Sequence, residues 1–358
     1  MDKIKISCPH CGQLLRCDER DRGHKVKCPH CKHSLRVPAN SPARSASTNR
    51  RSAKQIYFLA GGGLTLAVLV IAVGMLLVWP VRVHWPDRRP IGVLFLASNF
   101  HSSATNPRGW FNDPSLDVTG PDGAKRFRKA LLDYTGRSIE ILKRTGAQGV
   151  IVWDLEGEQF PHKTTFIGDP RLVGRLAPEM APVVDELFQR LRDAGLRVGV
   201  TIRPQQLVFD VGGQPRQTQV LNIKRTLLEK IDYAKAHWGA TLFYVDSTGG
   251  ILRPDEVWQL RSLAKQRPDI LLIPEHHYLP YGAFTAPYVA LKKDDASVTA
   301  NWAQRLFPKS FQALDIGDAA SDWAKIAIAR SQGDILLFRA WTWSPECQLL
   351  EGFAHESH

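Results

Sequence analysis

Cysteine is scarce in most of this sequence, because beyond residue 31 only Cys347 occurs. A single cysteine cannot form an internal disulfide, so the large C-terminal part must depend on its own hydrophobic core, which its length allows. Aromatic residues are missing from the other end: residues 1–54 contain no Phe, Tyr or Trp. That absence removes the platform on which many nucleic-acid-binding modules stack bases.

Excess positive charge is also missing from most of the chain, although the formal net charge is +12. Residues 1–54 carry 13 Lys and Arg against 4 Asp and Glu, which accounts for nine of the twelve charges. The basic surface therefore belongs to a small N-terminal module. Without stacking aromatics, nucleic acid is disfavoured as its partner, and a protein or a lipid headgroup surface is preferred.

The other five cysteines lie within the first 31 residues. Two C-x2-C pairs separated by 16 residues can place four thiolates around one tetrahedral Zn²⁺; the ligands would be Cys8, Cys11, Cys28 and Cys31. Cys17 is surplus to these four. The pattern predicts a structural zinc ribbon over 1–38, with the metal supplying much of its folding free energy. The module resembles the N-terminal zinc ribbons of membrane-anchored proteins of Planctomycetes-type bacteria.

A flexible polar linker is expected over 39–54, and an uncharged apolar run of 24 residues follows, from Ile56 to Trp79. This run is long enough to cross a hydrocarbon core of about 30 Å, so we expect a transmembrane helix over 55–80. The charge bias between its flanks is small, but thiolate ligands persist best in a reducing compartment. We therefore expect a single-pass membrane protein with its N-terminus in the cytoplasm and residues 88–358 in the periplasm.

Residues 88–358 alternate between apolar strands and amphipathic helices. Strands are predicted at 91–98, 149–156, 196–203, 240–247, 269–276, 310–317 and 334–341, and helices at about 124–144, 178–194, 222–237, 254–266 and 321–331. This alternation predicts an α/β fold with a parallel sheet covered on both faces. Seven strands in about 270 residues favour a (β/α)8 TIM-type barrel whose eighth strand lies within 283–292. A doubly wound open sheet is the alternative.

The connections that follow strands are long, and those that precede strands are short. Long loops in a compact domain usually carry function, and barrel active sites lie at the C-terminal ends of the strands. The functional site is therefore expected on that face. Within the first long loop, the segment 106–113 around Trp110 fits either a substrate lid or a packed loop.

Six strands end in polar or aromatic side chains. Asp154 and Glu156 follow the second strand and share its parity with Val150 and Val152, which are expected to fill the barrel. The remaining ends supply Arg203, Asp246, Glu275 with His276 and His277, Asp315, and Arg339 with Trp341 and Trp343. We expect these side chains to meet at one mouth of the barrel.

Carboxylates beside aromatic platforms suit a carbohydrate, because one acid must protonate the leaving oxygen while another attacks the sugar or stabilises its positive charge. At the level of strand pattern, with the segment FYVDSTGG ending the fourth strand, the domain resembles the (β/α)8 glycoside hydrolases, especially the α-galactosidase and α-glucosidase relatives. The resemblance implies that Asp246 is the nucleophile. Those relatives carry the acid/base on the sixth strand, which has no clear counterpart here. Glu275 is the substitute, with Asp154 or Glu156 behind it.

The expected substrate-binding residues are Arg203, His277, Asp315, Arg339, Trp341, Trp343 and Trp110. No H-x-H pair occurs on the first strand, so metal-dependent hydrolysis is disfavoured and no cofactor is expected in the barrel. The leading hypothesis is a membrane-anchored glycoside hydrolase acting on an extracytoplasmic glycan. One alternative is a non-catalytic glycan receptor or pseudoenzyme that signals to the zinc ribbon. A second is a regulator whose ribbon binds DNA.

Overall fold

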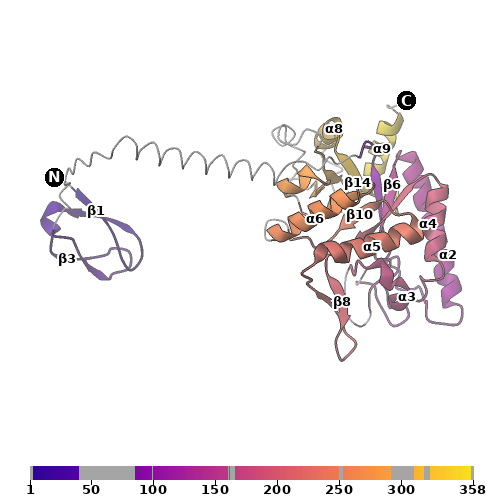
Figure 1. The fold of residues 1–358 in the computed structure, drawn as a ribbon, viewed down its shortest axis with the longest axis horizontal. Coiled ribbons are helices and arrows are strands. Elements are labelled where there is room, and N and C mark those ends of the chain that lie inside the picture. The colour runs from indigo at the N-terminus through magenta and orange to yellow at the C-terminus, as the bar shows by residue number, and fades with distance from the viewer. Residues whose placement is uncertain are drawn as a thin grey trace. The chain divides into compact units, whose positions relative to one another are not determined.

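The computed structural model describes residues 3–39, 85–98, 100–159, 161, 166–249, 253–276, 278–291, 310–317 and 323–355. The chain divides into two compact units, Met1–Val73 and Gly74–His358 (Figure 1). The transmembrane helix predicted over 55–80 lies outside the described residues. Among the described helices, none combines the length and the apolar character needed to cross a membrane.

The N-terminal module, residues 3–39, consists of two antiparallel hairpins. They are formed by β1 (Lys3–Ser7) with β2 (Leu14–Asp18) and by β3 (Lys25–Lys27) with β4 (Ser34–Arg36), and the short helix η1 (Glu19–Asp21) lies between them. The hairpins repeat one pattern, since the tetrapeptide C-P-H-C at 8–11 recurs at 28–31. The surplus Cys17 is buried with Leu15, Leu35 and Val37 in a small core. So little apolar surface cannot hold the module by itself.

The second unit is built on eight parallel strands. They are β5 (Ile91–Phe95), β6 (Gly149–Trp153), β7 (Arg197–Ile202), β10 (Leu242–Val245), β11 (Leu271–Pro274), β12 (Tyr288–Ala290), β13 (Ala313–Asp315) and β14 (Ile335–Arg339). The sheet order is β11-β10-β7-β6-β5-β14-β13-β12, so the first strand pairs with the last. The Ala286 N–H donates to the Leu272 carbonyl at 3.1 Å and joins the remaining edges. The predicted barrel is confirmed over the open sheet, and its eighth strand lies within 283–292.

Helices surround the strands (Figure 1). They are α2 (Gly123–Arg144), α4 (Val184–Asp193), α5 (Ile223–Trp238), α6 (Pro254–Gln266), α8 (Trp323–Ser331) and α9 (Pro345–His355), with the short η2 (Pro170–Leu172), α3 (Val173–Leu176) and η4 (Leu279–Ala283). In α2 the buried residues Phe127, Leu131 and Tyr134 recur every three or four positions, as an amphipathic helix requires. Sequence patterns missed α9 and the hairpin of β8 (Gln206–Phe209) and β9 (Pro215–Thr218).

The apolar residues of the barrel form two clusters. One lies between the strands and the surrounding helices, and the other lies inside the barrel. Val150 and Val152 face the helices in the outer cluster, whereas Ile151 and Trp153 belong to the interior cluster. The prediction that Val150 and Val152 fill the barrel was therefore wrong. A strand that is apolar on both faces carries no alternation, so its sequence cannot reveal which parity points inward. For β10 the predicted parity is correct, because Leu242 and Tyr244 lie inside.

Candidate active site

Side chains of interior parity continue past the C-terminal ends of the strands and form the mouth of the barrel. Asp246 follows Leu242 and Tyr244 of β10, and Glu275 follows Leu271 and Ile273 of β11; all four of these apolar side chains lie inside. By the same alternation the predicted residues Arg203, Asp315 and Arg339 extend the interior faces of β7, β13 and β14. The structure thus brings five of the predicted site residues to one end of the barrel.

Asp246 and Glu275 form a pair of carboxyl groups at this mouth. The backbone N–H of Ser247 lies 2.9 Å from Asp246 Oδ1 and 2.6 Å from Glu275 Oε2, so both oxygens accept from one donor. Ser247 has a φ of 58°, in the left-handed region, and this conformation directs its N–H between the two acids. On the other side, Arg203 Nε donates to Asp246 Oδ2 at 2.5 Å. Asp246 is therefore bound at both oxygens.

The environments of these two acids differ. Burial, followed by the neighbouring Asp246 charge, raises the pKa of Glu275. Asp246 instead forms an ion pair with Arg203, and only 7% of its side chain is exposed. Burial thus favours the protonated form of Glu275, while Asp246 is held by the Arg203 guanidinium, and such a difference lets one carboxyl pair divide acid and base roles.

Asp154 lies beyond the end of β6 with a φ of 61°. This left-handed residue interrupts the strand alternation, and its side chain lies near Arg203 and Asp246 although its parity is that of the outer wall. Asp154 Oδ2 is buried and has no hydrogen-bond partner among the described residues. Burial, reinforced by Glu158 and Glu156, raises the pKa of Asp154 well above its usual range.

Glu158 is a further buried acid that the sequence-based list of site residues omitted. It is 2% exposed, and its Oε2 has no partner within the described part of the chain. The positive charge of Arg203 favours the ionised form of Glu158. Burial raises its pKa to about 7. A buried carboxyl group whose pKa is raised toward neutrality beside other acids is a candidate for proton transfer. Its signal in the sequence was a third acid on alternate positions after the strand.

Glu156 lies apart from the carboxyl pair. Its Oε1 accepts the Asp169 N–H at 2.7 Å, and its charge interacts with Asp169 and Lys230. Burial raises the pKa of Glu156 to about 7. These contacts place Glu156 in the wall between the loops that follow β6 and β7, where it supports the mouth.

Lys230 of α5 is fully buried beneath these loops. Its ammonium group donates to the carbonyls of Gly168 (3.0 Å), Arg203 (2.7 Å) and Gln205 (2.8 Å), which uses all three donors. Asp169 Oδ2 lies 3.6 Å from Nζ. Burial lowers the pKa of Lys230 to about 8. Lys230 therefore joins two strand-end loops and holds the backbone of the arginine that binds Asp246.

Gly168 is required at this junction. Its φ is 60°, and a Cβ there would lie 2.8 Å from the Arg203 nitrogen. The Gly168 carbonyl also accepts the Arg203 N–H at 3.0 Å. Sequence inspection missed both residues, although Lys230 stands on the apolar stripe of its helix with Ile223, Leu227 and Ala234.

Aromatic side chains form one wall of the mouth. Phe95 contacts Trp153, Phe166 and Trp341, with ring centroids 4.7, 6.2 and 5.5 Å apart. Trp153 also lies 4.5 Å from Tyr244, directly below Asp246 on β10. Of this wall only Trp341 was predicted from the sequence. The Trp153 Nε1 is buried without a partner among the described residues.

The other predicted binding residues have different surroundings. Trp110 is fully buried, packs against Phe127 at 5.1 Å and donates from Nε1 to Glu179, so 106–113 is a packed loop. Trp343 is covered by the Arg144 guanidinium, 3.7 Å from its ring. Asp315 accepts from the Tyr288 hydroxyl at 2.7 Å and from the Gly317 N–H at 2.9 Å. His277 lies outside the described residues.

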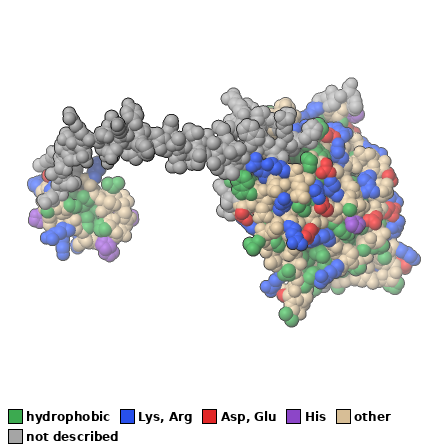
Figure 2. Space-filling view, in the orientation of Figure 1, with side chains coloured by type: hydrophobic (Ala, Val, Ile, Leu, Met, Phe, Trp, Pro, Cys, Tyr) green, Lys and Arg blue, Asp and Glu red, His purple; other side chains and the backbone are tan. Residues whose placement is uncertain are grey.

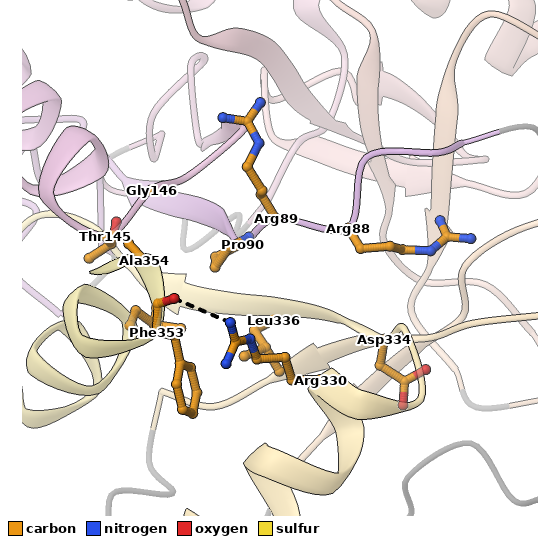
Figure 3. A pocket seen from close by; sticks show the side chains of 11 residues that line it. Arg88, Arg89, Pro90, Thr145, Gly146, Arg330, Asp334, Leu336, Phe353 and Ala354 are labelled. Atoms are coloured by element: carbon orange, nitrogen blue, oxygen red, sulfur yellow. Dashed lines mark hydrogen bonds between the residues drawn. The ribbon is translucent and has the colours of Figure 1, made fainter. Parts of the chain in front are cut away.

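A cavity of about 560 Å³ lies at the opposite end of the barrel (Figure 3). It is lined by Pro90, Gly146 and Asp334, which precede β5, β6 and β14, and by Phe353 of α9. Arg330 donates to the Phe353 carbonyl at 3.2 Å, and Arg88 and Arg89 point away from Phe353 in Figure 3. This cavity is on the N-terminal side of the strands and is separate from the acidic mouth.

The N-terminal module contains a four-cysteine cluster that can hold a metal such as zinc. The sulfurs of Cys8, Cys11, Cys28 and Cys31 all lie within 4.8 Å of one another. The Cys8–Cys31 and Cys11–Cys28 sulfur distances are both 3.7 Å. A tetrahedral Zn²⁺ with Zn–S bonds of about 2.3 Å requires sulfurs about 3.8 Å apart, so the spacing fits. Backbone N–H groups, chiefly that of Cys31, lower the pKa of the Cys28 thiol to about 6, whereas the pKa values of Cys11 and Cys31 in the same cluster are raised.

Comparisons with known proteins add only remote similarities. No family model and no curated protein matches the sequence. The chain is similar to a maltogenic alpha-amylase of Thermotoga neapolitana, with 14% identity, a TM-score of 0.35, and coverage of 56% of this chain and 49% of that one. An alpha-L-fucosidase shows 11% identity and a TM-score of 0.43 over 76% and 74% of the two chains. For the Thermotoga maritima alpha-fucosidase the values are 12% and 0.41 over 77% and 73%. The chain thus spans about half the length of the amylase.

Proposed function

We propose that the barrel is a glycoside hydrolase, with Asp246 as nucleophile and Glu275 as acid/base. One observation carries the proposal: two carboxyl groups share the Ser247 N–H at the C-terminal face of the barrel, beside an aromatic wall. Aromatic faces pack against the C–H surfaces of sugar rings. Paired carboxyl groups are the catalytic equipment of most glycosidases.

The spacing of the pair supports a retaining mechanism. Because both oxygens accept from one N–H, they lie closer together than the about 6.5–9.5 Å that separates the acids of inverting enzymes. In the proposed reaction Asp246 attacks the anomeric carbon while Glu275 gives its proton to the leaving oxygen. Glu275 then takes a proton from the water that releases the sugar from Asp246.

A second function is favoured by one specific contact. Arg203 and the Ser247 N–H bind both oxygens of Asp246, so this carboxylate must release Arg203 before it attacks. In a glycan receptor or pseudoenzyme the Arg203–Asp246 ion pair would stay formed when the sugar binds. The mouth would then bind a sugar between the aromatic wall and the Arg203–Asp246 pair without cleaving it.

We also propose that residues 55–80 anchor the barrel to a membrane, with the N-terminal module in the cytoplasm and the barrel in the periplasm. The support is the uncharged 24-residue run from Ile56 to Trp79, together with four thiolates that need a reducing compartment. We propose zinc as the metal of the four-cysteine cluster, because the sulfur spacing matches its tetrahedral radius.

Residues 85–358 provide the test of catalysis. They are screened against aryl α- and β-glycosides as wild type, Asp246→Asn and Glu275→Gln, with Asp232→Asn as the matched control, since Asp232 pairs with Arg267 on the outer surface. We expect turnover by the wild type and the control and a loss of at least 10³-fold in both mouth variants. Sugar binding without turnover, abolished by Arg203→Met, would replace the hydrolase with the receptor. Full activity in Asp246→Asn would move the chemistry to Asp154 and Glu158.

A further inference from the structure

The two hairpins of the N-terminal module place like charges directly opposite each other. Lys5 of β1 is the Cα partner of Arg16 of β2, and Lys25 of β3 is the Cα partner of Arg36 of β4. All four side chains are exposed. Like charges across a strand pair destabilise a hairpin. The module nevertheless does this twice, in a unit with very little core to offset the cost.

The arrangement is repeated by the module's internal symmetry. An offset of 20 residues carries C-P-H-C at 8–11 onto 28–31, and the same offset carries Lys5 onto Lys25 and Arg16 onto Arg36. The alternate positions, Leu15 and Leu35, are buried. Each hairpin therefore has one face for the core and one face for a cationic pair.

Acidic residues do not neutralise these pairs. The described module carries Asp18 at the end of β2, where it is the Cα partner of Lys3, and Glu19 and Asp21 in η1. Asp21 accepts the Asp18 N–H at 2.8 Å, and Glu19 pairs with Arg22 at 2.8 Å. Within residues 3–39 no ion pair reaches Lys5, Arg16, Lys25 or Arg36, and Arg36 Nε instead donates to the Gly23 carbonyl at 2.9 Å. On the visible face of the module in Figure 2 blue and purple side chains lie among green and tan ones with little red, whereas blue and red are interspersed on the barrel.

We infer that these two faces bind the anionic headgroups of the membrane that the apolar segment enters. The inference rests on the proposed span. An anionic partner offsets the repulsion within each pair, and the linker that follows adds Arg44, Arg50, Arg51 and Lys54 before the apolar run begins at Ile56. A module tethered this closely remains near the bilayer surface, where each basic side chain increases binding about five-fold. Nucleic acid is the weaker fit, because the module has no aromatic residue on which bases stack.

The test uses the full chain in nanodiscs of phosphatidylcholine, alone or with phosphatidylserine. The rate of acetylation of Lys5 and Lys25 is measured by mass spectrometry, and exposed Lys129 of the barrel reports on the reagent. We expect several-fold slower acetylation of Lys5 and Lys25 with phosphatidylserine and recovery at high salt, because the attraction is screened. Lys129 should react equally in both discs.

Paired variants separate a specific surface from net charge. Arg16→Gln with Arg36→Gln leaves both reporter lysines in place and should remove most of their protection, by about 25-fold in headgroup binding. Arg20→Gln with Lys32→Gln removes the same charge away from the strand faces and should leave the protection largely intact. Metal content checks that each variant is folded. An equal loss of protection in both double variants would overturn the inference, because it would show that net charge and not the strand faces determines lipid binding.

Two further outcomes also overturn it. Equal acetylation in both discs would show that the module does not contact anionic lipid. Protection by added duplex DNA, with none from phosphatidylserine, would assign the faces to nucleic acid. If the chain stays in solution and does not enter nanodiscs, the proposed span fails instead, and flotation of the soluble chain with phosphatidylserine vesicles still tests the hairpin faces.

Discussion

The N-terminal module and the barrel hold their polar centres by opposite means. Besides the four cysteines of the cluster, the described module buries only Leu15, Cys17, Leu35 and Val37 in its core, so the metal must contribute the stability that the apolar surface cannot. The barrel has two large apolar clusters and buries acids, an arginine and a lysine at one end, where Arg203 pairs with Asp246 and Lys230 donates to three backbone carbonyls. A small unit depends on a ligand for its fold, whereas a large unit can bear the cost of a polar site.

Removing the metal should produce the largest difference between the module and the barrel. A chelator that strips zinc is expected to unfold β1 to β4, since structural zinc contributes about 10–16 kcal/mol in small domains. The barrel should keep its protection. Hydrogen exchange of the full chain, followed peptide by peptide, measures both. Cys28→Ser should reproduce the effect, whereas Cys17→Ser should remain metal-bound. A protected module without metal would contradict the comparison.

In the barrel the largest effect is expected at Lys230. Lys230→Met leaves three buried carbonyls without a donor, while Asp169 keeps its ion pair with Arg171 at 2.8 Å. The substitution should cost about 3–5 kcal/mol in the free energy of unfolding, because each buried carbonyl without a partner costs about 1–3 kcal/mol. Lys235→Met is the matched control on the same helix. Lys235 pairs with Asp269 near the surface, where a salt bridge contributes about 0–1 kcal/mol. Urea unfolding of residues 85–358 compares the two variants. Equal losses in the free energy of unfolding would show that the buried contacts of Lys230 do not stabilise the barrel more than a surface ion pair does.

The pH dependence of stability should expose the buried acid Glu158. Its pKa is raised from 4.5 to about 7 by burial, so the folded state binds a proton that the unfolded state releases. This contribution is complete below pH 4.5 and is lost as pH rises through 7. It amounts to at most about 3 kcal/mol. Glu158→Gln should flatten that part of the stability curve, measured by urea unfolding at each pH. An unchanged dependence of stability on pH in the variant would show that a group other than Glu158 binds this proton.

The smallest expected effect lies within the module's own repeat. Lys32 has a φ of 63° at the position where the first hairpin has Gly12, with a φ of 74°. Lys32→Gly should relieve the left-handed strain and increase metal affinity by about 1 kcal/mol, or roughly five-fold. Gly12→Ala should weaken it by a similar amount. Competition with a chromogenic chelator measures both. A change in metal affinity in only one of the two variants would show that the two hairpins are not equivalent.

Patterns with a single strong period were interpreted correctly from the sequence. The spacing of Cys8, Cys11, Cys28 and Cys31 predicted one cluster, and the alternation of apolar strands with amphipathic helices predicted the barrel. Asp246, Glu275 and Arg203 were selected because they end strands, and parallel strands all end at the same face. The transmembrane prediction lies outside the described residues and stays a prediction.

Properties that depend on the other strands were not accessible in this way. Val150 and Ile151 are equally apolar, and only packing against helices or against the opposite wall decides which one lines the barrel. Trp110 and Trp343 look like binding platforms in a list, yet neighbours distant in sequence cover both. The roles of Lys230 and Gly168 arise from three carbonyls on two loops that only the fold brings together.

By itself, the sequence determined the metal-binding spacing, the division into a basic module and a near-neutral barrel, and the face on which the acids emerge. These properties depend on the spacing of residues and on the order of segments along the chain, both of which can be read from the sequence. Only the tertiary structure decided that Asp246 is held by Arg203 and the Ser247 N–H, that Glu156 supports the wall, and that Glu158 is buried. Charge, proton and contact at a site depend on what is excluded from water around it, and that exclusion exists only after distant segments have packed.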